Sequence, residues 1–190
     1  MDLLLRTTDA APPAGKIRRL FGAQDPPPFV PVPVTWRVVV FSADGVSDPL
    51  ARGRELAAAE RSSRPGHGQP GGAGRITRAL EALEERFASQ IEAMGSPQDG
   101  YVAASDLDAG MAFDLTPGRV EIRTYGLTYF PPTRGGTLFR DAAQAIVSAG
   151  DFDTVYDPQL DRLVTFPADT DAISAAWVKA FEREVARVTA

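Results

Sequence analysis

The sequence predicts a single α+β domain over residues 1–190, in which a mixed or mostly antiparallel sheet packs against four to five helices. Three observations support this prediction: a β-branched and aromatic run at 34–41, a hairpin pattern over 109–130, and an apolar helical stripe over 76–94. The order of these elements and the turns between them imply α+β. A chain of 190 residues is long enough to build one hydrophobic core.

The N-terminal segment carries weak structural signals. Leu3–Leu5 is consistent with a short first strand, and the basic stretch after Pro12 predicts a helical turn that stops at Gly22. Residues 25–33 hold five prolines, which lack a backbone N–H and favour an extended path. We therefore predict a Pro-rich connector at 25–33.

Two elements and a loop follow the connector. Residues 34–41 predict a central strand buried on both faces, because most of them are β-branched or aromatic. Residues 48–61 predict an Ala-rich helix with Asp48 as its N-cap and Pro49 at the first helical position. Residues 64–74 are so rich in Gly and Pro that we expect a flexible loop there.

The most regular helical pattern begins just after this loop. Apolar residues recur at spacings of three and four from 76 to 94, which places them on one side of a helix that Gly95 and Pro97 would end. We expect this stripe to pack on the chain's own sheet. The alternative is a short coiled coil with a partner helix, for which fewer than three heptads give little support. The stripe consists of Ile76, Leu80, Leu83, Phe87, Ile91 and Met94.

The remaining chain predicts two strand pairs and two helices. Strands at 109–115 and 119–130 flank the turn residues Thr116-Pro117-Gly118, and a helix at 137–149 follows. A second pair of strands, at 154–157 and 162–166, is joined by a turn at Pro158. The last helix begins near Thr170. Its apolar stripe consists of Ile173, Trp177, Phe181, Val185 and Val188.

The residue types that carry much enzyme chemistry are scarce. The chain has no Cys, which excludes disulfides, thiolate zinc sites, iron–sulfur clusters and cysteine nucleophiles. Its one His, His67, falls in the Gly-rich loop, where nothing would hold it within hydrogen-bond reach of a nucleophile. We predict no catalytic residue, no cofactor and no metal.

The sequence contains no signal for export or membrane insertion. The N-terminus has an acid, Asp2, where a signal peptide carries positive charge, and its apolar run is short. The apolar stretch at 29–41 is interrupted by prolines and is too short to span a bilayer. We expect a cytoplasmic protein with no membrane contact.

Charge is distributed unevenly along the chain, whose net charge is −5. The first 78 residues hold 11 basic and 7 acidic groups, whereas residues 79–190 hold 9 and 18. An acidic second half argues against nucleic-acid binding, because phosphates require clustered Lys and Arg. It favours a basic protein partner, although a solvated acidic surface that serves solubility explains the same pattern.

Residues 38–46 (VVVFSADGV) contain a buried strand that ends in Ser-Ala-Asp-Gly. This segment resembles the first motif of the haloacid dehalogenase-like phosphatases, in which a strand ends in Asp-x-Asp-Gly. In that family the first Asp is the covalent nucleophile and binds Mg²⁺. Here Ser42 takes its place and Asp44 matches the second acid, so the resemblance implies a phosphate-handling site that lacks its nucleophile. The alternative is that Asp44-Gly45 forms a turn.

Two Gly-rich helix starts are candidate anion sites, because the free N–H groups of a helix N-terminus attract negative charge. The first contains Gly74 and Arg75, but a P-loop would require a preceding strand and Gly-Lys-Ser/Thr. The second contains Arg134, Gly135 and Gly136. Ordinary loops that lead into a helix explain both.

The region 99–171 is rich in Asp and Tyr and forms the candidate partner-binding surface. Its acids have no calcium-loop spacing, and caps and turns explain each of them separately. We expect the aromatic residues Tyr101, Tyr125, Tyr129 and Tyr156 to be exposed there. The candidate contact residues are Tyr125, Tyr129, Arg134, Asp151, Asp153 and Asp157.

Three functions remain open. The first is a non-enzymatic protein-binding module, such as an acidic immunity- or antitoxin-like inhibitor or an adaptor for a basic partner. The second is a small-anion-binding protein or phosphate-handling enzyme that uses Asp44 and Arg134. The third is a structural or assembly component. The scarcity of catalytic residues favours the first.

Overall fold

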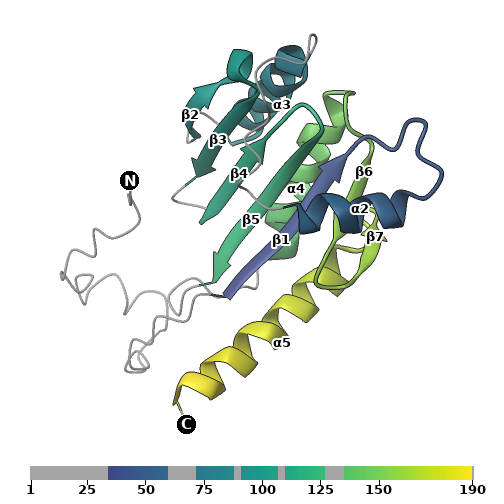
Figure 1. Cartoon of the computed structure of the whole chain (residues 1–190). Helices are drawn as coiled ribbons and strands as arrows, with labels where there is room; N and C mark the ends of the chain where they lie inside the picture. The colour runs from purple at the N-terminus through teal and green to yellow at the C-terminus, as the bar shows by residue number, and fades with distance from the viewer. Residues whose placement is uncertain (1–33, 60–71, 88–90, 107–109, 127–134, 190) are drawn as a thin grey trace.

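The structure, a computed structural model, describes residues 34–59, 72–87, 91–106, 110–126 and 135–189 (Figure 1). These residues form seven strands, four α-helices and one short 3-10 helix, η1 (Pro97–Asp99). The strands are β1 (Val34–Phe41), β2 (Glu92–Ser96), β3 (Tyr101–Asp106), β4 (Met111–Leu115), β5 (Arg119–Gly126), β6 (Thr154–Asp157) and β7 (Arg162–Val164). The helices are α2 (Pro49–Ala58), α3 (Gly72–Arg86), α4 (Gly135–Ser148) and α5 (Thr170–Thr189).

The seven strands form one sheet in the order β2-β3-β4-β5-β1-β6-β7. Every neighbouring pair is antiparallel, so the α+β prediction is confirmed and the sheet is antiparallel throughout. β1 lies inside the sheet next to the middle strand β5, and pairs Val38 with Ile122 of β5 and Val40 with Val155 of β6. The strand predicted at 34–41 is confirmed as an interior strand.

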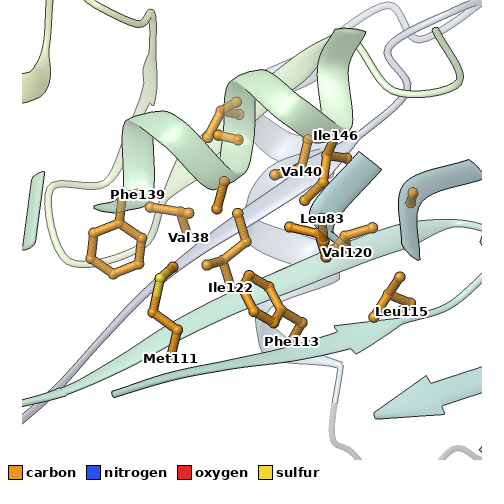
Figure 2. Close-up of a cluster of buried hydrophobic side chains, with 14 of the residues drawn as sticks. Val38, Val40, Leu83, Met111, Phe113, Leu115, Val120, Ile122, Phe139 and Ile146 are labelled. Carbon is orange, nitrogen blue, oxygen red and sulfur yellow. The ribbon is translucent and has the colours of Figure 1, made fainter. Parts of the chain in front are cut away.

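One face of the sheet is covered by α3, α4 and α5, and the main hydrophobic core lies between the two layers. Strand residues such as Val38, Phe113 and Ile122 alternate toward this face and are fully buried. Figure 2 shows them together with Leu83 of α3 and Phe139 of α4. Because the free energy of folding comes mainly from burying apolar area, this layer is the main stabilising contact of the fold.

The helix α2 covers the opposite face of the sheet at its β1–β6 end (Figure 1). Its start follows the sequence prediction, because Asp48 accepts a hydrogen bond from the Ala51 N–H at 3.0 Å and Pro49 opens the first turn. Gly53 allows close packing, since a Cβ there would lie 2.6 Å from Cγ of Tyr156. The small core beneath α2 consists of Val39, Phe41, Ala57 and Tyr156.

The helix predicted over 76–94 is wrong in its second half. The helix α3 ends at Arg86, and residues 92–96 form the strand β2, which pairs with β3. Gly95 has a φ of +101°, a value that no α-helix contains, and Met94 is exposed. Pairing with β3 decides the conformation here, because local periodicity is a weak preference that long-range contacts override.

The strand β3 was not among the predicted elements. Its sequence, YVAASD, contains small residues, which are depleted in strands, so its alternation between buried and partly exposed positions is hard to recognise. The order of α4, β6, β7 and α5 matches the prediction, with ends that differ by a few residues. The predicted loop over 64–74 overlaps α3, because residues 72–74 already belong to that helix.

Several predicted features lie outside the described residues. These are the first strand and helical turn, the connector at 25–33, most of the loop at 64–74, and the strand residues beyond Gly126. Among the described residues, no helix combines the length and apolar character needed to cross a membrane.

Candidate functional site

Alternation along the strands places a row of side chains on the sheet face opposite α3, α4 and α5. On this face α2 lies over the β1–β6 end, and no described helix lies over β2, β3 and β4 (Figure 1). Cross-strand pairing puts Met94 opposite Ala103 and Ser96 opposite Tyr101. We call this uncovered area the open sheet face. It consists of Glu92, Met94, Ser96, Tyr101, Ala103, Ser105, Ala112 and Asp114.

Two large hydrophobic side chains stand on the open sheet face. Met94 is 68% exposed and Tyr101 is 39% exposed. They occupy diagonal positions on β2 and β3, where side chains of neighbouring strands come within reach of each other. The smaller side chains of Ala103 and Ala112 lie next to them on β3 and β4 and are half-buried. The open sheet face therefore presents two exposed hydrophobic side chains beside smaller ones.

A charged network borders the open sheet face. Asp114 accepts a hydrogen bond from the Tyr101 hydroxyl at 2.7 Å and pairs with the Arg123 guanidinium at 2.5 Å. Glu121, which is 3% exposed, lies 3.7 Å from Nε of Arg123 and 3.8 Å from the guanidinium of Arg37. The two carboxylates are balanced by two guanidiniums, which is how buried charges are tolerated. The network joins four strands and helps to orient the Tyr101 ring.

Two buried atoms of the network have no hydrogen-bond partner among the described residues. Oε1 of Glu121 and Nε of Arg123 are both buried, and neither has a hydrogen-bond partner, because their separation of 3.7 Å exceeds a normal hydrogen bond. Buried polar atoms are usually satisfied, so these two atoms are an exception within the charged network, and both lie below the surface of the open sheet face.

Negative charge gathers at the β2 edge of the sheet. Glu92 on β2 and Asp99 in η1 are exposed. In the part of the chain that the structure describes, neither carboxylate takes part in an ion pair. The charges of Asp114 and Glu121 are balanced within the network, so Glu92 is an exposed, unbalanced acid of the open sheet face, while Asp99 lies beyond the end of β2 in η1, which contacts α3.

The predicted contact residue Asp151 is part of an ion pair within the fold. The Arg78 guanidinium donates two hydrogen bonds to it, at 2.6 and 2.8 Å, and lowers the pKa of its carboxyl. Nε of Arg75 lies 3.9 Å from the same carboxylate. Asp151 and the predicted anion-binding residue Arg75 therefore interact with each other and connect α3 to the loop before β6.

The other two predicted acids also have structural roles. Asp153 accepts hydrogen bonds from the Ala43 N–H and the Thr154 hydroxyl, both at 2.8 Å. Asp157 is 0% exposed and accepts hydrogen bonds from Nε1 of Trp36 at 3.0 Å and from the backbone of the following turn. Burial raises the pKa of Asp157. Asp157 is therefore below the surface and cannot contact a partner directly.

Two of the four predicted tyrosines have described side chains, and these two differ in exposure. Tyr101 is exposed as expected, but Tyr156 is buried beneath α2, because it faces the small core there. Tyr125 is in β5, and nothing is described of its side chain. Tyr129 and Arg134 lie outside the described residues.

Packing accounts for one glycine of the two predicted anion sites. Gly136 is buried where α4 meets α5, and a Cβ there would lie 2.1 Å from the Ser174 hydroxyl oxygen and 2.4 Å from the Thr170 carbonyl oxygen. Gly135 is the first residue of α4. Gly74 is in the first turn of α3, next to Arg75. Close helix packing explains Gly136 without a ligand.

Asp44 is an exposed turn residue. The Val46 N–H donates to the Ala43 carbonyl at 2.9 Å, and Gly45 has a φ of +71°, which supports the interpretation of this segment as a turn. No group of three or more acidic or His side chains that could hold a metal occurs among the described residues.

Sequence reasoning missed the open sheet face. Met94 was assigned to a helix, and the small residues of β3 concealed the alternation that would have placed Tyr101 and Ala103 together. The pattern Met111-Ala-Phe-Asp-Leu115, apolar on one side and small or acidic on the other, was the available signal. Comparison of the chain with protein-family models, with curated proteins and with solved structures finds no match in any of the three.

Proposed function

We propose that this protein is a protein-binding module whose open sheet face receives a basic segment of another polypeptide. One observation carries the proposal. Among the described residues, three large hydrophobic side chains are exposed, and two of them, Met94 and Tyr101, stand together on the open sheet face. Exposed aromatic residues and Met are enriched at protein interfaces, where they serve as anchors.

The expected charge of the partner follows from the edge beside these anchors. Glu92 is an exposed acid on the same face of β2 as Met94, and Asp99 is an exposed acid in η1, two residues before Tyr101. A Lys or Arg beside an apolar side chain would match this surface, and such complementarity speeds encounter and selects partners more than it adds affinity. An inhibitor of the immunity or antitoxin type, or an adaptor, would be a more specific version of this proposal. It rests on similarity of size and charge alone.

The alternative of a phosphate-handling site at Asp44 and Arg134 has less support. Asp44 is exposed in a turn, and Arg134 lies outside the described residues. The third alternative, an assembly component, drew on the Pro-rich segment and on a long amphipathic helix at 76–94. The segment lies outside the described residues, and the helix α3 ends at Arg86, so this alternative has less support. Protein binding is therefore the function with the most support.

The test compares three variants with the wild type in a pull-down from native lysate at low and high salt. Met94→Ser removes an anchor, and Glu92→Lys reverses a charge. Leu163→Ser is the matched control, because Leu163 is the third exposed hydrophobic residue and lies on β7 at the other edge of the sheet. The retained protein is then purified, and its affinity for each variant is measured.

We expect Met94→Ser and Glu92→Lys each to weaken binding about tenfold, while Leu163→Ser stays within about twofold of wild type. High salt should release the partner, since exposed charges are screened. A partner that Met94→Ser holds as tightly as wild type would contradict the assignment of this surface. An acidic partner, or one released by nuclease treatment, would contradict the assigned charge. Retention of nothing at either salt would count against the binding function itself.

A further inference from the structure

A second site lies between α5 and the turn that follows β6, on the side of the molecule away from β2. Here α5 runs beside β1, and its C-terminal half extends past the end of the sheet (Figure 1). The space between them is a groove of about 580 Å³. Its apolar walls are formed by Trp36, Leu160 and Ala176. We call this space the α5 groove. Small-molecule sites typically have volumes of roughly 300 to 1,000 Å³ and mostly apolar walls.

Two cations stand together along the α5 side of the groove. Lys179 and Arg183 are four residues apart and so share one side of the helix, and both are exposed. Neither forms an ion pair among the described residues. Arg183 donates only to the backbone carbonyl of Lys179, at 3.3 Å. One acid, Glu182, also lines the groove, which leaves an excess of one positive charge.

The opposite wall is held in place by a buried carboxylate. Asp157 accepts a hydrogen bond from the Trp36 indole at 3.0 Å and from the Gln159 and Leu160 N–H groups at 2.8 and 2.9 Å. It thereby fixes both the indole and the turn that carries Leu160. A wall fixed before binding lowers the entropy that a ligand must remove. Asp157, which cannot reach a partner surface, has a positioning role here.

We propose that the α5 groove binds a small amphipathic anion, with its apolar body against Trp36, Leu160 and Ala176 and its carboxylate between Lys179 and Arg183. A guanidinium pairs with a carboxylate through two parallel hydrogen bonds, and the ammonium of Lys179 adds a third donor. This site is separate from the open sheet face, so the inference does not depend on the proposed function.

The test uses naphthoate as the anionic probe and naphthylmethanol as its uncharged analogue. Binding to the full chain is measured by calorimetry, and amide and indole shifts in two-dimensional NMR locate the site. Arg183→Met and Lys179→Met each remove one positive charge and keep an unbranched, flexible side chain at that position. Arg187→Met is the matched control, because Arg187 is on the same helix, pairs with Glu184 and does not line the groove.

We expect saturable naphthoate binding that shifts the Trp36 indole signal and the amides of residues 159–160 and 176–186. Arg183→Met should weaken it about tenfold, Lys179→Met somewhat less, and Arg187→Met less than about twofold. Glu182→Gln should strengthen binding about twofold, because it removes the one opposing charge. Asp157→Asn should also weaken naphthoate binding, although residue 157 does not touch the probe, because Asp157 positions the Trp36 indole and the turn that carries Leu160. Circular dichroism checks that the Asp157→Asn variant is folded.

Four results would overturn the inference. Naphthylmethanol could bind as tightly as naphthoate, which would remove the role of the cations. Arg183→Met and Arg187→Met could weaken binding equally, which would indicate attraction to the whole helix and no defined site. The shifts could fall away from Trp36 and α5, or no saturable binding could occur, and either result would exclude this groove.

Discussion

The two ends of one sheet face differ in whether a described helix covers them. At the β1–β6 end, α2 covers Val39, Phe41 and Tyr156, which are almost completely buried. At the β2–β4 end the same face has no described helix over it, and Met94 and Tyr101 are exposed. Both ends share a sheet and an alternating pattern, so exposure at the second end is not a consequence of strand geometry.

The covered end shows what a closed surface requires. Gly53 allows the helix to approach, and Arg54 donates two hydrogen bonds to Asp161, each at 2.7 Å, which ties α2 to the turn before β7. The open end instead carries small residues, a charged network and two exposed anchors. A surface of this kind, with unburied apolar groups beside charges, is typical of a place where another molecule binds.

The largest effect is expected from shortening a side chain at the covered end. Phe41→Ala should lower the free energy of unfolding by about 3 to 5 kcal/mol, because it leaves a cavity in the small core beneath α2. Met94→Ala at the open end should change it by less than about 0.5 kcal/mol, since that side chain loses little contact. Urea denaturation of both variants measures the difference. Equal losses would mean that the open end is packed as tightly as the covered end.

A smaller effect is expected from adding a methyl group where α2 packs closely against the sheet. Gly53→Ala should destabilise the protein by about 1 to 2 kcal/mol, because its Cβ would overlap Tyr156, and this outweighs the better helix propensity of Ala. Gly118→Ala is the control, since no atom lies within 4 Å of a Cβ there. Thermal unfolding of the two variants tests this. Stabilisation by Gly53→Ala would show that α2 can move away at no cost.

The smallest effect is expected from the exposed ion pair that ties down α2. Hydrogen bonds from Arg54 and Tyr156 lower the pKa of Asp161 from 3.8 to about 2. Because the folded state then loses its proton more readily than the unfolded state, the pair stabilises the fold above the unfolded pKa and stops doing so as pH falls through about 2. The unfolding free energy of wild type should therefore exceed that of Asp161→Asn near neutral pH, and this excess should disappear as the pH falls through about 2.

This difference should be modest, since exposed ion pairs contribute little. It should also shrink in high salt. Denaturation measured from neutral pH down to about pH 2 provides the curve. A difference that grows as pH falls would contradict the assigned sign.

Much of the fold could be predicted because its signals are local. The run of Val and aromatic residues in β1 and the Asp48-Pro49 start of α2 each specify an element within a few residues. The segment 92–96 could not be predicted in this way. Its spacing fits a helix, and only the pairing with β3 makes it a strand.

The candidate site was harder to predict than the fold. Asp151 and Asp157 looked like surface acids in sequence, yet their partners Arg78 and Trp36 lie 73 and 121 residues away. Met94 and Tyr101 are close in sequence, but the strand that brings them to one face was read as a helix. The sequence shows how many acidic residues the region contains. It does not show which of them form hydrogen bonds or ion pairs within the fold and so are not free to contact a partner.

The sequence by itself determined the fold class, the interior strand β1, the capped start of α2 and the absence of cysteine chemistry. These follow from propensity, periodicity and composition, which act over a few residues or over the chain as a whole. Only the tertiary structure decided where α3 ends, which carboxylates are buried or paired, and which part of the sheet no described helix covers. Those outcomes depend on contacts between residues far apart in the chain, and such contacts outweigh local preference wherever burial and charge pairing are at stake.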